Sequence, residues 1–97
     1  MKILALEREI PDAPSMVTKD LLMAEAAKVW ELYLSGVIRE HYFSVEMHTA
    51  VLILECEDQK SAGHFLGQLP LVQHRLIDFE LIPLAPYDGF ERLFEDR

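Results

Sequence analysis

The stretch Leu69–Leu84 constrains the fold most, because it joins a helix stop to a strand that carries carboxylates. Pro70 cannot continue a helix, since its nitrogen has no hydrogen to donate. Side chains alternate along a strand, so Asp78 and Glu80 share one face, opposite an apolar face. We expect this strand to pack a core with one face and to line a ligand site with the other.

The composition indicates a small globular protein that associates with itself. The chain has 97 residues, the length of one domain, 1–97, and its hydrophobic share is 51%. That share is high for so short a chain, so part of the apolar surface is expected between subunits. The formal charge of −8, from 9 Lys and Arg against 17 Asp and Glu, opposes contact with a polyphosphate. We therefore expect no nucleic-acid partner.

The hydrophobic pattern also argues against a membrane protein. No apolar run approaches the roughly 20 residues that span a bilayer, and the first residues lead into charges without a signal-peptide core. We expect no membrane partner and a cytoplasmic location. The single Cys56 lies between Glu55 and Glu57, whose charges raise a thiol pKa, so we interpret it as a buried small residue.

Alternation and helical periodicity predict six elements in a recognisable order. Strands are expected at 2–8, 37–45, 49–57 and 77–84, with the middle two forming a hairpin. Thr18 can cap a helix that ends at Gly36, and Asp58 can cap a second helix that Pro70 closes. The order strand, helix, strand, strand, helix, strand is that of an α+β, ferredoxin-like β-α-β-β-α-β sandwich.

The first helix is expected to bury the stripe of Leu22, Ala26, Val29 and Tyr33, with Trp30 as a core residue at its edge. At the other end of the chain, residues 88–97 place apolar side chains at helical spacing among charges. This tail is expected to form a short helix, packed either on its own domain or on a partner. The apolar tail residues are Phe90, Leu93 and Phe94.

Two helices can cover only one face of a four-stranded sheet. The other face is not uniformly polar, since Val51 and Ile53 are both candidates for it. Covering it with a second copy of the sheet satisfies the rule that apolar faces are buried in layers. The sequence therefore predicts a homodimer that pairs sheet to sheet as a dimeric α/β barrel.

Several segments resemble the muconolactone delta-isomerase-like family of dimeric α/β barrel proteins. They are Gly36–Phe43, Ala50–Cys56, Leu69–Leu71 and the strand end Ile82–Leu84, and the similarity in spacing covers most of residues 19–86. The resemblance implies a homodimer with facing sheets and a cavity between sheet and helices or between the sheets. It also implies a proton shift in a small unsaturated lactone. On the second strand this chain keeps Arg39 of the family's arginine and aromatic pattern and replaces the rest.

The second strand carries the first group of candidate site residues. Strict alternation places Arg39, His41 and Phe43 on one face, where His41 could move a proton and Arg39 could hold a substrate carboxylate. Tyr42 is a further candidate for substrate binding. The alternative is that this strand lies at the sheet edge and its charges are solvated.

The last strand carries the second group. Asp78 is a candidate for substrate binding and Glu80 for a second acid or base, and both could face Arg39 across a pocket. The alternative is an ion pair in the core or the interface. Glu7 and Glu55 are further carboxylates on strands that could add to the lining.

Metal and cofactor chemistry is not expected. The four histidines fall on a strand, a turn, a helix and a loop, without the paired spacing of a zinc site. The sequence has no Gly-rich phosphate loop and no nucleophile elbow, which disfavours nucleotide binding and covalent catalysis. We expect neither a metal nor a cofactor.

These patterns favour a small-molecule enzyme of isomerase type, in which His41 moves a proton in a small anionic or lactone substrate held by Arg39. Two alternatives stay open. One is a non-catalytic small-molecule binding or interaction module, and the other is a cofactor-free monooxygenase of the same fold.

Overall fold

The computed structural model describes residues 1–13 and 16–95 and confirms the predicted α+β order. Each predicted strand and both predicted long helices are present. The short helix α3 was not expected as a separate element, and the short helix expected in the tail is of the 3₁₀ type. The elements are β1 (Lys2–Glu9), α1 (Lys19–Leu34), β2 (Ile38–Phe43), β3 (Ala50–Glu55), α2 (Gln59–Leu66), α3 (Pro70–Gln73), β4 (Ile77–Leu84) and the 3₁₀ helix η1 (Gly89–Phe94).

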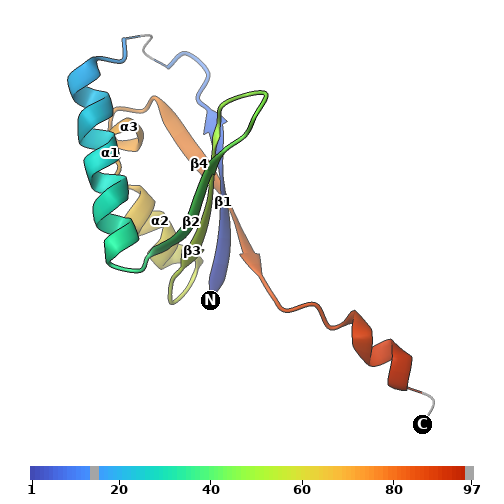
Figure 1. The fold of residues 1–97 in the computed structure, drawn as a ribbon. Helices are drawn as coiled ribbons and strands as arrows, with labels where there is room; N and C mark the ends of the chain where they lie inside the picture. Colours follow the sequence, from blue (N-terminus) through green and yellow to red (C-terminus); the bar gives the residue numbers. More distant parts are fainter. Residues whose placement is uncertain (14–15, 96–97) are drawn as a thin grey trace.

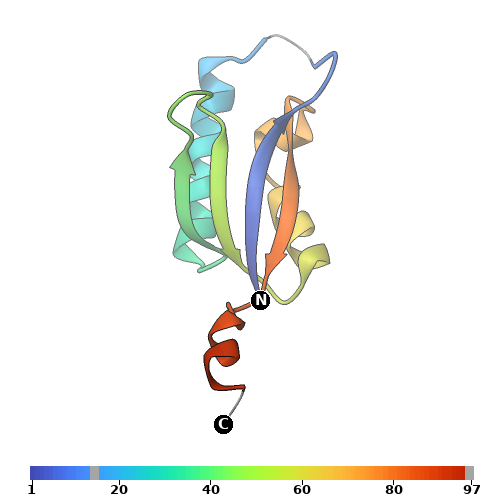
Figure 2. The same cartoon turned by 90° about the vertical axis from the view of Figure 1, so that its right-hand side faces the viewer.

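The four strands form one antiparallel sheet in the order β2-β3-β1-β4. In the described part of the chain, α1, α2 and α3 lie on one face of the sheet, which we call the inner face, and no helix covers the other, outer face (Figure 1). Figure 2 looks onto that outer face, with the helices behind the strands. Within the described residues, no helix is long and apolar enough to cross a bilayer.

The core lies between the inner face and the helices. The register places Ile3 beside Leu54, and Ile38 beside Leu54 from the other side, so a fully buried row crosses β1, β3 and β2. Leu32 of α1 and Leu66 of α2 close over the sheet. The expected interior position of Cys56 is confirmed, and burial, together with the charge of Glu55, raises the pKa of its thiol.

Local signals determine where the helices begin and end. The Leu21 amide donates to Thr18 Oγ1 (3.1 Å) and the Ser61 amide to Asp58 Oδ1 (2.7 Å), so both predicted N-caps are confirmed. Gly36 follows α1 with φ +86°, the left-handed conformation expected of it.

The predicted buried face of α1 was wrong except at Val29, which packs against the core. Leu22, Trp30 and Tyr33 are 50%, 59% and 42% exposed, whereas Leu32 is buried. The buried face is rotated by one residue and includes Glu25 at its centre. Apolar residues occupy two adjacent faces of this helix. The buried face carries the Glu25 carboxylate, so the sequence pattern favoured the neighbouring face, which is exposed.

The second predicted helix is shorter than expected. α2 ends at Leu66, and Pro70 begins α3 instead of closing α2. Proline is compatible with the first turn of a helix, where its missing N–H would have no partner. The result is a bend that turns Leu69 into the core and aims the Leu71 amide toward α1.

The predicted tail helix exists as η1, but it packs on neither layer of its own chain. After β4 the described chain runs away from the sheet and helices and ends in η1 (Figures 1 and 2). The last two residues of the predicted helix, 96 and 97, lie outside the described residues.

Candidate active site

A β-bulge in β2 decides which of its side chains lie on the inner face of the sheet, and those that follow the bulge stay exposed there. Ile38 pairs with Leu54 and Glu40 with Ile53, so Arg39 is an extra residue between them. The bulge reverses the alternation, which places His41 and Phe43 on the inner face. The expectation that Arg39 shares their face is wrong, because it assumed an unbroken strand.

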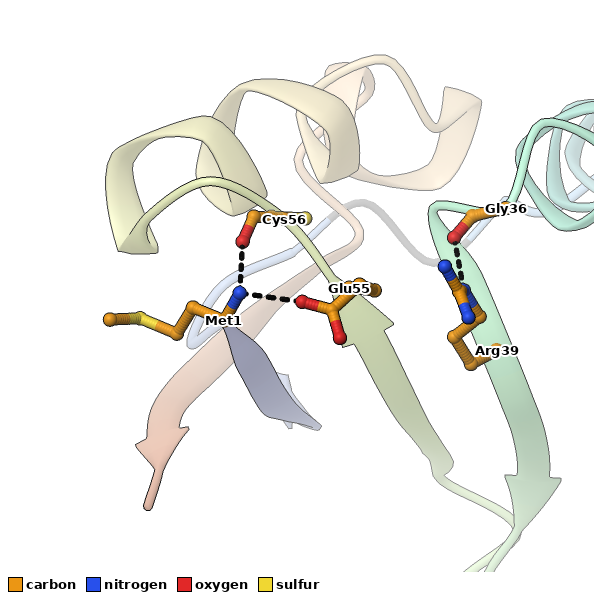
Figure 3. A network of polar contacts seen from close by, with 5 residues as sticks. All are labelled: Met1, Gly36, Arg39, Glu55 and Cys56. Carbon is orange, nitrogen blue, oxygen red and sulfur yellow. Dashed lines mark hydrogen bonds and ion pairs between the residues drawn. The ribbon is translucent and has the colours of Figure 1, made fainter. Parts of the chain in front are cut away.

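The Arg39 side chain instead forms a hydrogen bond at the end of the sheet. Its Nε donates to the Gly36 carbonyl (2.7 Å), which anchors the turn after α1 (Figure 3). The pKa of Glu55 is lowered mainly by the hydrogen bond that its carboxylate accepts from the Met1 nitrogen, and the charge of Arg39 lowers it further. Arg39 does not face Asp78 or Glu80 as predicted.

Asp78 and Glu80 lie on the outer face, on the opposite side of the sheet from His41. Asp78 pairs with Arg8 in the register and accepts a hydrogen bond from its Nε (3.2 Å). Both side chains of this ion pair are about half exposed, so within one chain it is not the core ion pair considered as an alternative. Tyr42 Oη donates to Glu40 on the same outer face (2.7 Å), and this bond raises the Tyr42 pKa. Asp78 and Glu80 therefore do not share a pocket with His41 within one chain. Tyr42, although its hydroxyl bonds to Glu40, also borders the hollow onto which His41 opens.

His41 opens instead onto a hollow between the inner face and the helices, with a volume of about 250 Å³. We call it the inner pocket. Most of its wall is apolar, and its polar side chains come from Glu7, Glu25 and His41. The apolar and aromatic lining is Val29, Tyr42, Phe43, Ala50, Leu52, Leu69, Leu71, Ile77 and Phe79.

Two carboxylates are held in this wall by backbone amides. Glu7 accepts a hydrogen bond from the Ala50 amide (2.8 Å), and Glu25 accepts one from the Leu71 amide (2.9 Å). Burial raises the pKa of Glu25, the Leu71 bond opposes this, and the negative charge of Glu7 raises it further. Both bonds use Oε1, so among the described residues Oε2 of each carboxylate is available to a proton or a ligand.

The imidazole of His41 is positioned by an aromatic neighbour. Its ring meets Tyr33 edge to face, with centroids 5.0 Å apart and planes at 82°. In the register His41 is opposite Leu52, which is buried, so the imidazole emerges over the apolar floor of the pocket. His41 is the predicted catalytic residue that lines the same pocket as two carboxylates.

This arrangement combines a base, a protonatable acid and an apolar cavity, the elements of proton transfer on a small organic molecule. Sequence reasoning noted Glu7 only as a further lining carboxylate and missed Glu25 altogether. Glu25 could have been predicted as a pocket residue from its position, because it lies one helical turn from both Leu21 and Val29 on the same face of the helix. Within residues 1–13 and 16–95, no three His, Cys, Asp or Glu side chains gather in a way that could hold a metal ion.

Comparison with solved structures defines the class of fold, which is the muconolactone isomerase-like fold that the sequence resembles. A crystal structure of muconolactone isomerase superimposes with a TM-score of 0.73, over 92% of this chain and 93% of that one. A second neighbour is 5-chloro-2-hydroxyhydroquinone dehydrochlorinase (TftG) from Burkholderia phenoliruptrix AC1100, in complex with 2,5-dihydroxybenzoquinone. Its TM-score is 0.69, over 92% of this chain and 98% of that one. Sequence identity is 17% in both cases, so these matches establish the fold. No family model and no curated protein matches the chain.

Proposed function

We propose that this chain is a small cytoplasmic, homodimeric enzyme that moves a proton within a flat, unsaturated ring compound bearing a carbonyl group. The observation that carries the proposal is the inner pocket, where His41, Glu7 and Glu25 border a mostly apolar cavity of about 250 Å³. Drug-sized ligands occupy roughly 300–1,000 Å³, so this cavity suits a single ring.

The three polar residues have separable roles in such a reaction. His41 takes a proton from the carbon next to the carbonyl, because imidazole exchanges protons near neutral pH. Glu25, whose raised pKa favours its protonated form, returns a proton to a second carbon of the same ring. Transfer from His41 to Glu25 then restores both groups, so the reaction is an isomerisation with no net gain or loss of protons.

Glu7 supports this cycle as a positioning residue. Its carboxylate is tied to the Ala50 amide, and its negative charge favours the protonated form of Glu25. A neutral residue at this position would make Glu25 a stronger acid and leave it ionised over more of the pH range.

The names of the two solved neighbours agree with this substrate class. One is an isomerase of muconolactone, and the other is a dehydrochlorinase with a dihydroxybenzoquinone bound. Muconolactone, in the name of the first, and the quinone bound to the second are both small oxygenated rings, which supports a small-molecule enzyme with a related substrate.

Exchange of carbon-bound hydrogen tests the proposal directly. Unsaturated lactones and dihydroxyquinones are incubated with the protein in D₂O, and deuterium incorporation at carbon is followed by NMR. We expect exchange with at least one compound, and a loss of about 10²–10⁴-fold for His41→Asn or Glu25→Gln, the usual contribution of a general acid or base. His74→Asn, on an exposed residue at the end of α3, is the matched control and should retain wild-type exchange.

Three outcomes would contradict the proposal in different ways. Wild-type exchange by His41→Asn would remove His41 as the base. Ligand-induced shifts of pocket resonances without exchange would favour the binding module. Oxygen consumption with the same compounds would favour the cofactor-free monooxygenase.

A further inference from the structure

The polar part of the inner pocket is acidic. Glu7 and Glu25 contribute two carboxylates and His41 contributes an imidazole, and none of the described residues that line the pocket is Lys or Arg. The rest of the wall is apolar or aromatic, so an ion that enters loses hydration and needs a partner of opposite charge. A carboxylate on a ligand would find no fixed cation in this wall.

Backbone hydrogen bonds keep both carboxylates in the wall. Glu7 accepts from the Ala50 amide (2.8 Å), at the start of β3, and Glu25 accepts from the Leu71 amide (2.9 Å), in α3. Turning either side chain away from an incoming anion would break its bond and leave a partly buried amide unpaired. The negative oxygens therefore stay where a ligand must bind.

The two carboxylates also sense each other. Burial raises the pKa of Glu25, and the negative charge of Glu7 raises it further. Such coupling requires a short separation and weak screening by water. A third negative charge in the same hollow of about 250 Å³ would be repelled in the same way. Protonation of Glu25 lessens this repulsion but leaves the charge of Glu7.

The arginines of the strands make their contacts elsewhere. Arg39, which was expected to hold an anionic substrate, donates to the Gly36 carbonyl at the end of the sheet (Figure 3). Arg8 forms its ion pair with Asp78 on the outer face. Neither arginine lines the inner pocket, so neither can neutralise a ligand carboxylate there.

An uncharged ring suits the same wall. Tyr42, Phe43 and Phe79 offer aromatic surface to a flat ligand. In its protonated form Glu25 can donate from Oε2 to a carbonyl oxygen, whereas ionised Glu7 can accept from an N–H or O–H group. Each of these hydrogen bonds forms with an uncharged partner.

We propose that the inner pocket binds uncharged unsaturated lactones and discriminates against the same rings when they carry a carboxylate, with the Glu7–Glu25 pair as the determinant of this specificity. The proposal rests on the proposed function for the class of ring and goes beyond it in assigning the charge. It selects the lactone, and not the anion, from the substrates expected from the sequence.

A matched pair of ligands isolates the effect of charge. An unsaturated five-membered lactone with a carboxymethyl substituent and the primary amide of the same compound have nearly the same shape and differ by one negative charge. Both are titrated into the full-length wild-type protein at neutral pH, and Kd is measured from the NMR shifts of pocket resonances. Because like charges brought together in a binding site are strongly unfavourable, we expect the amide to bind at least about tenfold more tightly.

Neutralising the wall should remove this preference. Glu7→Gln combined with Glu25→Gln keeps a carbonyl acceptor for both backbone amides and removes both charges. We expect the Kd values of acid and amide to agree within about threefold in this double variant. Glu57→Gln combined with Glu91→Gln removes two charges from exposed residues outside the pocket. This matched control should keep the wild-type ratio.

The wild-type ratio tests the proposal without any variant. Equal or tighter binding of the acid, or binding of neither ligand, would overturn it. An unchanged ratio in the folded double variant would also overturn it, because the two carboxylates would then not determine the specificity. Tighter binding of the amide without deuterium exchange would support the specificity and refute the proposed reaction, so the two failures are distinguishable.

Discussion

The apolar centre of the outer face predicts that two copies of the chain associate through this face of the sheet. The register aligns Ile53, Leu4 and Ile82 in one row across β3, β1 and β4, and Val51 and Leu6 lie in the next row. Charged residues border this apolar block, among them Glu80, which is opposite Leu6, and the Arg8–Asp78 ion pair. An apolar centre with a polar rim is the usual anatomy of a protein interface. The change we consider is Ile53→Asp, at the middle of the sheet.

Lost apolar burial and the cost of a buried charge together set the size of the effect. Ile53 is already partly buried in the single chain, so docking a second sheet adds at most about 1 kcal/mol per side chain. The new carboxylate matters more, because each ion buried under a partner sheet costs several kcal/mol. With two new carboxylates in a symmetric dimer, the total is at least about 5 kcal/mol, which weakens the dimer Kd more than about a thousandfold.

Sedimentation over a range of concentrations measures this change. We expect wild type at about twice the 11.2 kDa chain mass at micromolar concentration, and Ile53→Asp close to the chain mass with an unchanged circular dichroism spectrum. Gln73→Asp, on exposed α3, carries the same new charge and should remain associated. A wild-type monomer, or an Ile53→Asp variant that associates as tightly as wild type, would refute the sheet-to-sheet dimer.

Two further predictions concern stability. Glu25 has its pKa raised above the ordinary value of 4.5, chiefly by burial, so the folded chain keeps a proton that the unfolded chain has released. Wild type therefore loses stability as pH rises from about 4.5 through the folded pKa of Glu25. The urea midpoint of Glu25→Gln should rise relative to that of wild type across this pH window. Parallel pH profiles of the two urea midpoints would contradict this. Gly36→Ala should cost about 1 kcal/mol or more because φ is +86°, whereas Gly63→Ala, whose Cβ would meet Leu81 at an ordinary 3.8 Å, should be neutral or stabilising. Equal thermal midpoints for the two alanine variants would show that the Gly36 turn carries no strain.

The features predicted correctly are those governed by neighbouring residues. Thr18 and Asp58 cap their helices through amides only three positions away, and Gly36 adopts a conformation that disfavours residues with a Cβ. Short runs of aliphatic, β-branched and aromatic residues, with alternation in some of them, then identified every strand. The element order followed from these local facts, and the fold from the order.

The site could not be predicted in the same way. One extra residue at Arg39 reverses the face of every later side chain in β2, and a bulge has no reliable signature in an apolar and aromatic strand. Glu25 was hidden because a carboxylate on a helix suggests a solvent face, yet the Leu71 amide at the start of α3 gives it a partner inside.

The sequence by itself determined the elements, their order and the presence of a surplus of apolar surface, because these depend on contacts within a few residues and on composition. Only the tertiary structure decided that His41 lines one pocket with Glu7 and Glu25, while Asp78 and Glu80 lie on the opposite face. The physical reason is that pairing register and helix rotation are set by how distant segments pack, and a shift of one residue in either moves a side chain from one face to the other.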